Sequence, residues 1–514
     1  MTNTASSVSK SFFWKLMERF GVSIVQFILQ IILARLLSPD HYGVLSIMII
    51  FTTLATVFVQ NGFNMALIQG KDVNEEDYSS VFWVSLFVAL LLYIALFFAS
   101  PLIADFYDMP SLITPFRVLA LMLFPGALNS VQLAKVSREM KFRKVFVSNI
   151  GAVLVSGVVG VALAYAGGGL WALVAQSLLN VVVACVVMCF TVNLRLRFIC
   201  NVKRVKKLFG YGWKLLVSAL IETLYQDLRS LVIGKKYNSS MLGYYNRGKQ
   251  FPQFINNAVN GTVQSVMLPA MSVQQDDKRA VKTMMRTSMR MSAFVMFPIM
   301  FGLAAVATPL VSILLTEKWL ECVPFMQIYC FTFAFYPVHS CNLQAINAIG
   351  RSDVFLKLEI IKKIYGITAL VIAILCFNSP VAIAMTGLIT TLISWIINAF
   401  PNKKLIKYSF SEQIKDLFPY IILSLIMGGV VYSLSLLEIS NLLMLLFQVV
   451  SGAIIYIAFS ALFKISEFYK LLNMIKKAFT KRKKEKKEEQ SFEKTTESNK
   501  TEIMPKEDKN NEEN

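Results

Sequence analysis

The chain is poor in charge and rich in apolar residues. Only 16% of its 514 residues are Asp, Glu, Lys or Arg, whereas 56% are hydrophobic and 39 residues are Phe. The mean hydropathy is +0.58. A soluble protein of this length needs far more charged side chains to cover its surface. The composition therefore excludes a soluble globule and predicts a polytopic membrane protein.

Histidine is scarce and nucleotide-binding motifs are missing. There is no Gly-x-x-x-x-Gly-Lys-Ser/Thr phosphate loop, which excludes a directly nucleotide-driven pump. The two histidines, His41 and His339, are far apart in the sequence and give no histidine metal cluster. For His339 two interpretations stay open, a proton-coupling group and a polar core residue with satisfied partners. We expect neither a cofactor nor a metal site.

Long apolar runs, in contrast, are abundant. A helix needs about 20 residues to cross the hydrocarbon core of a bilayer, and about 14 runs of this length occur along the chain. We therefore expect an all-α protein with about 14 transmembrane helices. The runs are 11–37, 42–69, 78–104, 111–136, 145–166, 170–192, 208–234, 241–268, 290–315, 323–349, 354–377, 380–400, 417–437 and 441–463.

Lys and Arg are unevenly distributed among the connections between these runs. The net charge of +20 alone could suggest a nucleic-acid partner, but the basic residues gather in alternate loops. Connections such as 105–110, 167–169 and 378–380 contain no Lys or Arg. The positive-inside rule then places both termini in the cytoplasm. The pattern favours a multi-pass protein of the bacterial cytoplasmic (inner) membrane that binds no nucleic acid.

Polar residues inside the apolar runs repeat about 200 positions apart. The first pair of stripes, 199 residues apart, consists of Lys15, Arg19, Ser23, Gln26 and Gln30, and of Lys214, Ser218, Glu222, Tyr225 and Arg229. The second pair, 200 residues apart, consists of Thr53, Thr56, Gln60 and Asn64, and of Gln253, Asn256, Asn260 and Gln264. Each stripe follows one helix face. A repeated polar seam is typical of a transporter cavity built from two related lobes.

This repeat defines the expected domain organisation. Both repeats begin on the predicted cytoplasmic side, so the two six-helix lobes should be related by a pseudo-two-fold axis along the membrane normal. Two extra helices and a tail follow, the tail being amphipathic at first and then Lys/Glu-rich, disordered and cytoplasmic. The expected boundaries are 1–200 for the N-lobe, 201–405 for the C-lobe, 406–464 for the two extra helices and 465–514 for the tail.

Charged residues within the runs are the candidate functional residues. A charge at bilayer depth costs about 2.5–3.5 kcal/mol or more, so such residues should line a water-filled cavity. The alternative is that the basic residues near the span ends only reach the interface, and that pairs of neighbouring charges are structural. The residues near the ends are Lys15, Lys214, Arg247 and Lys249, and the pairs are Glu18 with Arg19 or Asp227 with Arg229. The candidate substrate-binding residues are Arg19, Arg229, Arg247, Arg117, Gln26, Gln30, Gln60, Asn64, Gln253, Asn256 and Asn260. The candidate coupling residues are Glu18, Glu222 and Asp227.

Two segments carry a family resemblance. One is Leu-Ala-Arg-Leu-Leu-Ser-Pro-Asp-His-Tyr-Gly at 33–43, and the other is Asn-Gly-Phe at 61–63, leading into Ala-Leu-Ile-Gln at 66–69. With the predicted spans, the chain resembles polysaccharide flippases of the multidrug/oligosaccharidyl-lipid/polysaccharide exporter superfamily. The nearest branch is similar to the O-antigen, colanic-acid and teichuronic-type exporters.

The resemblance implies a transport function rather than an enzyme. Family members turn an oligosaccharide carried on undecaprenyl pyrophosphate from the cytoplasmic to the periplasmic leaflet by alternating access, during lipopolysaccharide or other surface polysaccharide biosynthesis. Arg19, Arg229 and Arg247 are the residues that match the cationic cavity of the family. The implied partners are the lipid-linked oligosaccharide and membrane lipids. A coupling cation (H+ or Na+) and polysaccharide polymerase machinery stay open as further partners.

Two alternatives were weighed against this function. A multidrug or organic cation antiporter of the same superfamily would need acids to dominate its cavity, whereas bases outnumber Glu18, Glu222 and Asp227 here. A membrane-integral polysaccharide polymerase or ligase would need large outer loops with catalytic groups, and the predicted outer loops are short. The sequence names neither the glycan nor the oligomeric state.

Overall fold

The computed structural model describes residues 21–70, 73–199, 201–437, 439–473 and 476, and all its regular secondary structure there is helical. The candidate residues Glu18 and Arg19 and the basic end of the tail lie outside the described residues. The chain divides into two compact units, Met1–Gly452 and Ala453–Asn514. The second unit contains the end of the last long helix and a helical stretch over 466–473. The following paragraphs concern the first unit.

The first half of the chain begins with an apolar helix over Gly21–Leu36. A broken path of short helices, Pro110–Arg138 including two 3-10 turns, occupies the position of the fourth predicted span. The helices of this half are α2 (Pro39–Gln69), α3 (Glu75–Tyr107), α4 (Ile113–Leu119), α5 (Leu123–Arg138), α6 (Phe142–Tyr165) and α7 (Leu170–Thr191).

The second half contains the longest helices. Its short helices α11, α12 and α13 arise where Val306 and Phe335 interrupt the apolar runs. The helices are α8 (Val202–Lys236), α9 (Ser239–Ser272), α10 (Lys278–Ala305), α11 (Ala307–Leu315), α12 (Val323–Ala334), α13 (Tyr336–Ala348), α14 (Ser352–Cys376), α15 (Pro380–Leu405), α16 (Phe410–Ser433) and α17 (Asn441–Leu462).

These helices confirm the prediction of an all-α polytopic membrane protein. Among the described residues, nine helical segments are long and apolar enough to cross a membrane. The helices α8, α9 and α14 have 35, 34 and 25 residues, which is also long enough, but polar and charged side chains interrupt their apolar surface. These three helices are therefore candidates for lining a cavity. The total of about 14 crossings stays a prediction.

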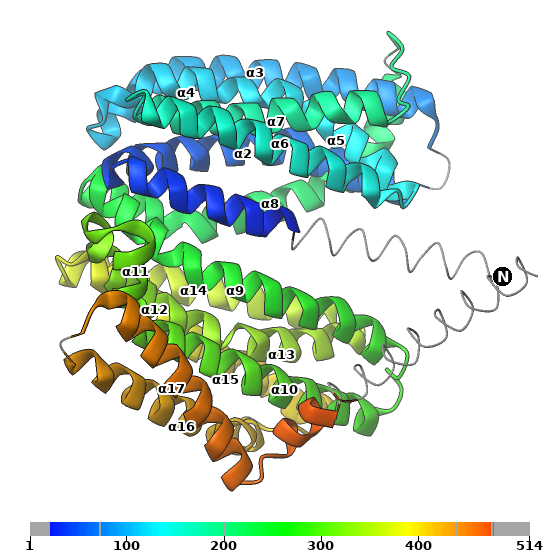
Figure 1. Ribbon diagram of the computed structural model, residues 1–514. Coiled ribbons are helices and arrows are strands. Elements are labelled where there is room, and N and C mark those ends of the chain that lie inside the picture. The colour runs from blue at the N-terminus through cyan, green and yellow to red at the C-terminus, as the bar shows by residue number, and fades with distance from the viewer. Residues whose placement is uncertain (1–20, 71–72, 200, 438, 474–475, 477–514) are drawn as a thin grey trace, which may run out of the picture. The chain divides into compact units, whose positions relative to one another are not determined.

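Helices pack on one another within each half of the chain, and α2 also packs on helices of the second half. Within the first half α6 packs on α7, and α2 packs on α5 and α3. Within the second half α9 packs on α12 and α13, α10 on α16, and α14 on α15 (Figure 1). Helix α2 crosses between the halves because it packs on both α8 and α9.

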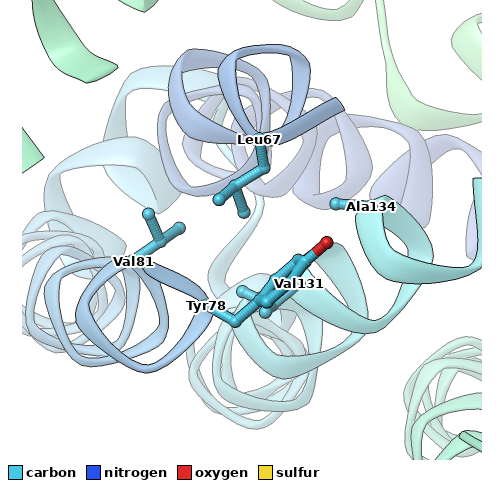
Figure 2. Packing of buried hydrophobic residues seen from close by; sticks show 5 residues of the cluster. All are labelled: Leu67, Tyr78, Val81, Val131 and Ala134. Atoms are coloured by element: carbon cyan, nitrogen blue, oxygen red, sulfur yellow. The ribbon is translucent and has the colours of Figure 1, made fainter. Parts of the chain in front are cut away.

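A small hydrophobic cluster fixes one end of the first half. Figure 2 shows Leu67 of α2, Tyr78 and Val81 of α3, and Val131 and Ala134 of α5 pointing toward one another. All five are buried, with at most 8% of the surface of each exposed. The burial of such side chains contributes roughly 1.5–3 kcal/mol for each large one. The cluster therefore holds α2, α3 and α5 together.

The last carbonyls of α2 find a donor on α5. Arg138 Nη1 donates to Leu67 O at 2.8 Å and to Gly70 O at 2.5 Å. The C-terminus of a helix leaves four carbonyl groups without intrahelical partners and carries a partial negative charge. A guanidinium satisfies both needs, so α2 ends against α5.

The predicted repeat is visible where α2 and α9 begin. These helices start at Pro39 and Ser239, 200 residues apart. A Cβ atom on Gly43 would lie 1.7 Å from the carbonyl oxygen of Ser239, and a Cβ atom on Gly243 would lie 2.1 Å from that of Pro39. Each helix thus presents a glycine to the first residue of the other. This reciprocal glycine contact has the form that a pseudo-two-fold axis requires.

Further bonds strengthen the same end of the molecule. Asp40 accepts a hydrogen bond from the hydroxyl of Ser239. Trp319 Nε1 donates to Ala34 O at 2.8 Å, and Lys318 Nζ donates to Arg35 O at 2.7 Å. Backbone oxygens at the end of the first helix therefore hold the turn before α12 in place. The two halves are closed against each other on the side that the loop charges predict to be periplasmic.

A second pair of equivalent features lies at the opposite end. Between α5 and α6, Lys141 N donates to Val136 O, and Met140 has a φ of 54°. Between α13 and α14, Arg351 N donates to Ile346 O, and Gly350 has a φ of 79°. Both turns are Schellman motifs with one left-handed residue. The two halves therefore share this turn as well as the glycine contact.

Candidate functional site

The second half of the chain encloses a polar cavity of about 490 Å³. Its walls come from six helices, α8, α9, α12, α13, α14 and α15. Of the described side chains that line it, four are cations, namely Arg229, Lys249, Lys362 and Lys363, and two are carboxylates, Glu222 and Glu359. Amides and tyrosines supply much of the rest. The cavity has an excess of positive charge, which attracts anions.

Helix α9 supplies an amide wall. Gln253, Asn256, Asn260 and Gln264 line the cavity at steps of three and four residues, so they share one helix face. Gln264 Nε2 donates to Ser340 Oγ at 3.0 Å. The Oδ1 atoms of Asn256 and Asn260 are buried and accept no hydrogen bond from any described residue. An unpaired buried oxygen is costly, so these two amides are available to a hydroxyl donor.

Arg229 projects from α8 and is held by threonines of α15. Its Nε donates to Thr386 Oγ1 at 3.0 Å, and its Nη2 donates to Thr390 Oγ1 at 3.4 Å. A guanidinium carries five N–H donors. The two hydroxyls orient the plane of the group, and its remaining donors are left to bind an anion from the cavity.

Lys249 is the cation of α9 in the same cavity. Among the described residues it has no hydrogen-bond or ion-pair partner, and its Nζ lies 5.9 Å from the centre of the Tyr329 ring. Asp227 of α8 is near enough to interact with it electrostatically. A half-buried ammonium group that lacks a direct partner is costly unless a ligand supplies one. Lys249 is therefore a second anion-binding candidate, and of the two interpretations of this lysine from the sequence the structure favours the cavity over the membrane interface.

A group of four charged residues joins α8 to α14. Lys363 Nζ lies 2.9 Å from Glu222 Oε2 and 3.9 Å from Glu359 Oε2, and Lys362 pairs with Glu359. Gln226 Nε2 donates to Glu222 Oε1 at 3.0 Å. Glu222, predicted as a coupling residue, is thus an ion-pair partner at the edge of the cavity. We name the four residues Glu222, Glu359, Lys362 and Lys363 the charged cluster.

The structure brings five of the sequence-predicted site residues together. The three amides Gln253, Asn256 and Asn260 line the cavity with Arg229 and Glu222. Asp227 lies near Lys249, close enough for the two charges to interact electrostatically. The duplicated stripe of the second half therefore does face one polar space.

The equivalent stripe of the first half is placed differently. Gln60 Nε2 donates to Gly126 O at 3.3 Å, and Asn64 Nδ2 donates to Ser130 O at 3.3 Å. Gln60 and Asn64 thus bond to α5 and are not among the residues that line the cavity, so the expected pairing of Gln60 with Asn260 is not found. The physical reason is that backbone carbonyls of a neighbouring helix already accept hydrogen bonds from the amide nitrogens of Gln60 and Asn64.

The glutamines of the first helix also lie away from the cavity. Gln26 is exposed on this helix and Gln30 is half-buried. Neither lines the cavity, so the structure does not join Gln30 with Arg229.

Arg117 and Arg247 have protein partners instead of a place in the cavity. Arg117 Nε donates to Ser100 Oγ at 2.9 Å, and its guanidinium stacks 4.0 Å over the Phe97 ring. Arg247 is 4% exposed and stacks on Tyr42 at 4.2 Å and on Trp319 at 5.3 Å. The first arginine joins α4 to α3, and the second stands beside the reciprocal glycine contact. Both have structural roles in this conformation.

The cavity residues that the sequence did not single out come from α12 to α15. Tyr329, Tyr336 and Thr390 carried no signal in the sequence, whereas Lys362 and Lys363 are charged residues within the apolar run 354–377. The charges were the available signal, because charged side chains on a long apolar helix should face a cavity.

Solved structures define the class of protein to which this fold belongs. The chain shares the fold of the lipid II flippase MurJ in an inward closed conformation, with a TM-score of 0.70, 17% identity, and coverage of 88% of this chain and 98% of that chain. The fold is therefore that of an all-α, multi-pass membrane protein.

Sequence relatives narrow this class to a family. The chain belongs to the family of polysaccharide biosynthesis proteins (Polysacc_synt_3), whose pattern matches residues 32–324. It is 22% identical to the teichuronic acid biosynthesis protein TuaB of Bacillus subtilis (strain 168), over 86% of this chain and 93% of that protein. It is 24% identical to the succinoglycan biosynthesis transport protein ExoT of Rhizobium meliloti (strain 1021), over 69% of this chain and 72% of that protein.

Proposed function

We propose that this chain is a flippase for undecaprenyl-pyrophosphate-linked oligosaccharide in surface polysaccharide export. It would turn its substrate from the cytoplasmic to the periplasmic leaflet of the bacterial inner membrane, with both termini in the cytoplasm. The observation that carries the proposal is the cavity of about 490 Å³ with an amide wall, tyrosines and four cations. The printed names of the relatives TuaB and ExoT, which concern polysaccharide biosynthesis and transport, support the same substrate class.

The lining suits each part of such a substrate. Sugar hydroxyls both donate and accept, and the amides of Asn256 and Asn260 do the same. Tyr329 and Tyr336 offer ring faces to the apolar faces of a sugar. Arg229 and Lys249 supply the positive charge that a pyrophosphate needs, and Arg offers it two parallel N–H donors. Arg19 completes this set in the proposal. The prenyl chain stays in the lipid.

The positions of the contacts support alternating access as the proposed mechanism. The reciprocal glycine contact closes the two halves at the predicted periplasmic end. Release of the oligosaccharide on that side requires α2 and α9 to separate there. Asp227 and Glu222, beside the cations of the cavity, are the residues through which H+ or Na+ would be coupled to this movement. Polymerase machinery would take up the released product.

The experiment that tests the function is reconstituted transport. Purified full-length protein in liposomes should move a fluorescent lipid-linked oligosaccharide to the opposite leaflet, where a membrane-impermeant glycosidase cleaves it. The same liposomes should show no efflux of a cationic dye. Dye efflux without oligosaccharide movement would favour the cation antiporter and overturn the proposal.

The other functions receive less support from the cavity. A cation antiporter needs a net negative binding site, whereas four cations and two carboxylates line this one. A polymerase or ligase needs catalytic groups in outer loops. The connection between α8 and α9 consists of Tyr237 and Asn238 alone. We therefore propose transport without an enzymatic step.

A further inference from the structure

Two lysines of α14 reach the cavity already paired with carboxylates. Lys363 and Lys362 are only 21% and 15% exposed, and both point their ammonium groups at members of the charged cluster. Lys363 is shared between Glu222 of α8 and Glu359 of its own helix. All four side chains line the cavity that the proposed function uses. The cluster is thus an ion-pair network that a ligand in the cavity would touch.

The two carboxylates of this network are not equivalent. Glu222 is 47% exposed, and its second oxygen keeps a hydrogen bond from Gln226 Nε2 at 3.0 Å. Glu359 is 25% exposed and faces both lysines. Loss of a partner is costly for a buried charge and cheap for a hydrated one that keeps another hydrogen bond. Glu222 is therefore the carboxylate that can leave Lys363.

We propose that Lys362 and Lys363 form a subsite for an anionic group on the glycan, a sugar carboxylate or a sugar phosphate, which displaces Glu222 from Lys363. The exchange replaces one carboxylate by another anion, so Lys363 meets no new desolvation cost. The Tyr225 ring centre lies 5.8 Å from Lys363 Nζ and offers a face to the sugar that carries the anion. This inference rests on the proposed function and adds the charge of the substrate to it.

Displacement also has a mechanical consequence. Glu222 and Lys363 form an ion pair between α8 and α14, and the hydroxyl of Tyr225 packs against the backbone of Gly366 beside it. An anionic sugar that binds Lys363 breaks this ion pair, and only the packing contact between Tyr225 and Gly366 remains. Binding of an acidic glycan would therefore loosen α8 from α14, whereas binding of a neutral glycan would not.

The test is equilibrium binding to the full-length protein in lipid nanodiscs. Three soluble probes are compared: a tetrasaccharide with one uronic acid, its carboxyl-reduced neutral counterpart, and the neutral tetrasaccharide with a phosphate on its non-reducing terminal sugar, away from the end that carries the pyrophosphate in the substrate. Lys363→Gln should weaken binding of the anionic probes about tenfold, the effect of one hydrogen bond to a charged group, and leave the neutral probe unchanged. The uronic acid and phosphate arms identify which anion the subsite takes.

Glu222→Gln is the deciding variant, because it removes the competitor and keeps the lysine. It should strengthen binding of the anionic probes about two- to fivefold, as expected when a resident carboxylate no longer competes. Lys363→Arg should retain the preference for the anion. Lys357→Gln is the control, since this lysine is exposed on α14 and does not line the cavity.

The outcomes separate the subsite from a purely structural ion pair. If Lys363→Gln and Glu222→Gln weaken binding of all probes alike, the pair only fastens α8 to α14 and the subsite proposal is wrong. If anionic and neutral probes bind the unchanged protein equally, the subsite proposal is also wrong, while glycan binding stands. If no probe binds, the subsite proposal is wrong, whereas the proposed function stands or falls by transport of the lipid-linked oligosaccharide in the liposome assay.

Discussion

Helices α2 and α9 begin with equivalent contacts, but the polar residues along them make different contacts. Both begin with a glycine contact to the other helix, and both carry amides at matched positions. In α9, Asn256 and Asn260 line a cavity, whereas in α2 the amide nitrogens of Gln60 and Asn64 donate to carbonyl groups of α5. The buried Oδ1 atoms of Asn64, Asn256 and Asn260 all lack a partner among the described residues, so it is the cavity that distinguishes α9. The comparison teaches that backbone contacts persist through a duplication while the partners of polar side chains diverge.

The physical basis of this difference is the cost of an unpaired polar group. An amide inside an apolar helix must find a partner, and either a neighbouring helix or a ligand can provide one. The amide nitrogens of Gln60 and Asn64 on α2 bond to a neighbouring helix, whereas Asn256 and Asn260 of α9 line a cavity that a ligand can enter. The polar cavity thus lies in the second half, although the polar pattern of the sequence is nearly even.

The largest expected effect concerns the feature that the halves share. Gly43→Ala or Gly243→Ala places a methyl group within about 2 Å of a backbone oxygen, so the starts of α2 and α9 must move apart. We expect a loss of about 1–3 kcal/mol of stability and a strong loss of glycan export for either variant. Thermal unfolding of detergent-solubilised protein and an export assay measure the two effects.

Gly429→Ala in α16 is the matched control for these substitutions. No heavy atom lies within 4 Å of a Cβ built there, so it should be neutral or slightly stabilising. Equal stability of Gly43→Ala and Gly429→Ala would mean that the reciprocal contact is not present. A strong effect at Gly43 without one at Gly243 would break the equivalence of the two halves.

The next effect tests the arginines of the two halves. Arg229→Ala removes a cation of the cavity, so transport should fall about tenfold or more, given roughly 1.5–3 kcal/mol for a hydrogen bond to a charged group. Arg229→Lys should be intermediate, because lysine keeps the charge and loses the planar fork. Initial rates in the liposome assay measure both variants, with exposed Lys214→Ala as the control on the same helix.

Arg117 of the first half should behave in the opposite way. Its substitution by Ala removes the bond to Ser100 and the stacking on Phe97, so stability should fall while the transport rate per folded molecule is kept.

An Arg229→Ala variant that restores full export to a flippase-deficient strain would show that Arg229, too, is structural.

A smaller effect compares the amides directly. Asn64→Ala should lower stability by about 1 kcal/mol, because it removes a hydrogen bond to α5. Asn260→Ala should leave stability unchanged and reduce transport severalfold, because its Oδ1 has no described protein partner to lose. Denaturant titration and transport rates distinguish the two. If Asn64→Ala slows transport without a loss of stability, the first half also faces the substrate.

The last effect, which concerns stability and leaves transport unchanged, lies at the two equivalent turns. Gly350 and Met140 both adopt a left-handed conformation, which costs a non-glycine residue about 1–2 kcal/mol. Met140→Gly should therefore stabilise the protein slightly, and Gly350→Met should destabilise it by a similar amount. Unfolding midpoints of the pair measure this. Changes of the same sign would contradict the equivalence of the turns.

The sequence predicts the helices and their repeat better than it predicts the partners of the polar side chains. The repeat, the helical class and the α9 amides follow from periodicity, because hydrophobic spacing and burial cost are local properties of the chain. The charged cluster does not follow, since Lys362 and Lys363 lie on a run with no counterpart in the polar repeat. Nor does the bonding of Gln60 to Gly126, because 66 residues separate them and only tertiary packing brings them together.

The reciprocal glycine contact has an evolutionary consequence. In a dimer with two-fold symmetry, a residue i that touches j in the partner is matched by a j that touches i. Gly43 against Ser239 and Gly243 against Pro39 reproduce this isologous geometry within a single polypeptide. In a homodimer every substitution at such a contact appears twice, so any clash is doubled. Within one chain the two halves can be substituted independently. The second half can therefore acquire charged residues while the contact through Gly43 and Gly243 is kept.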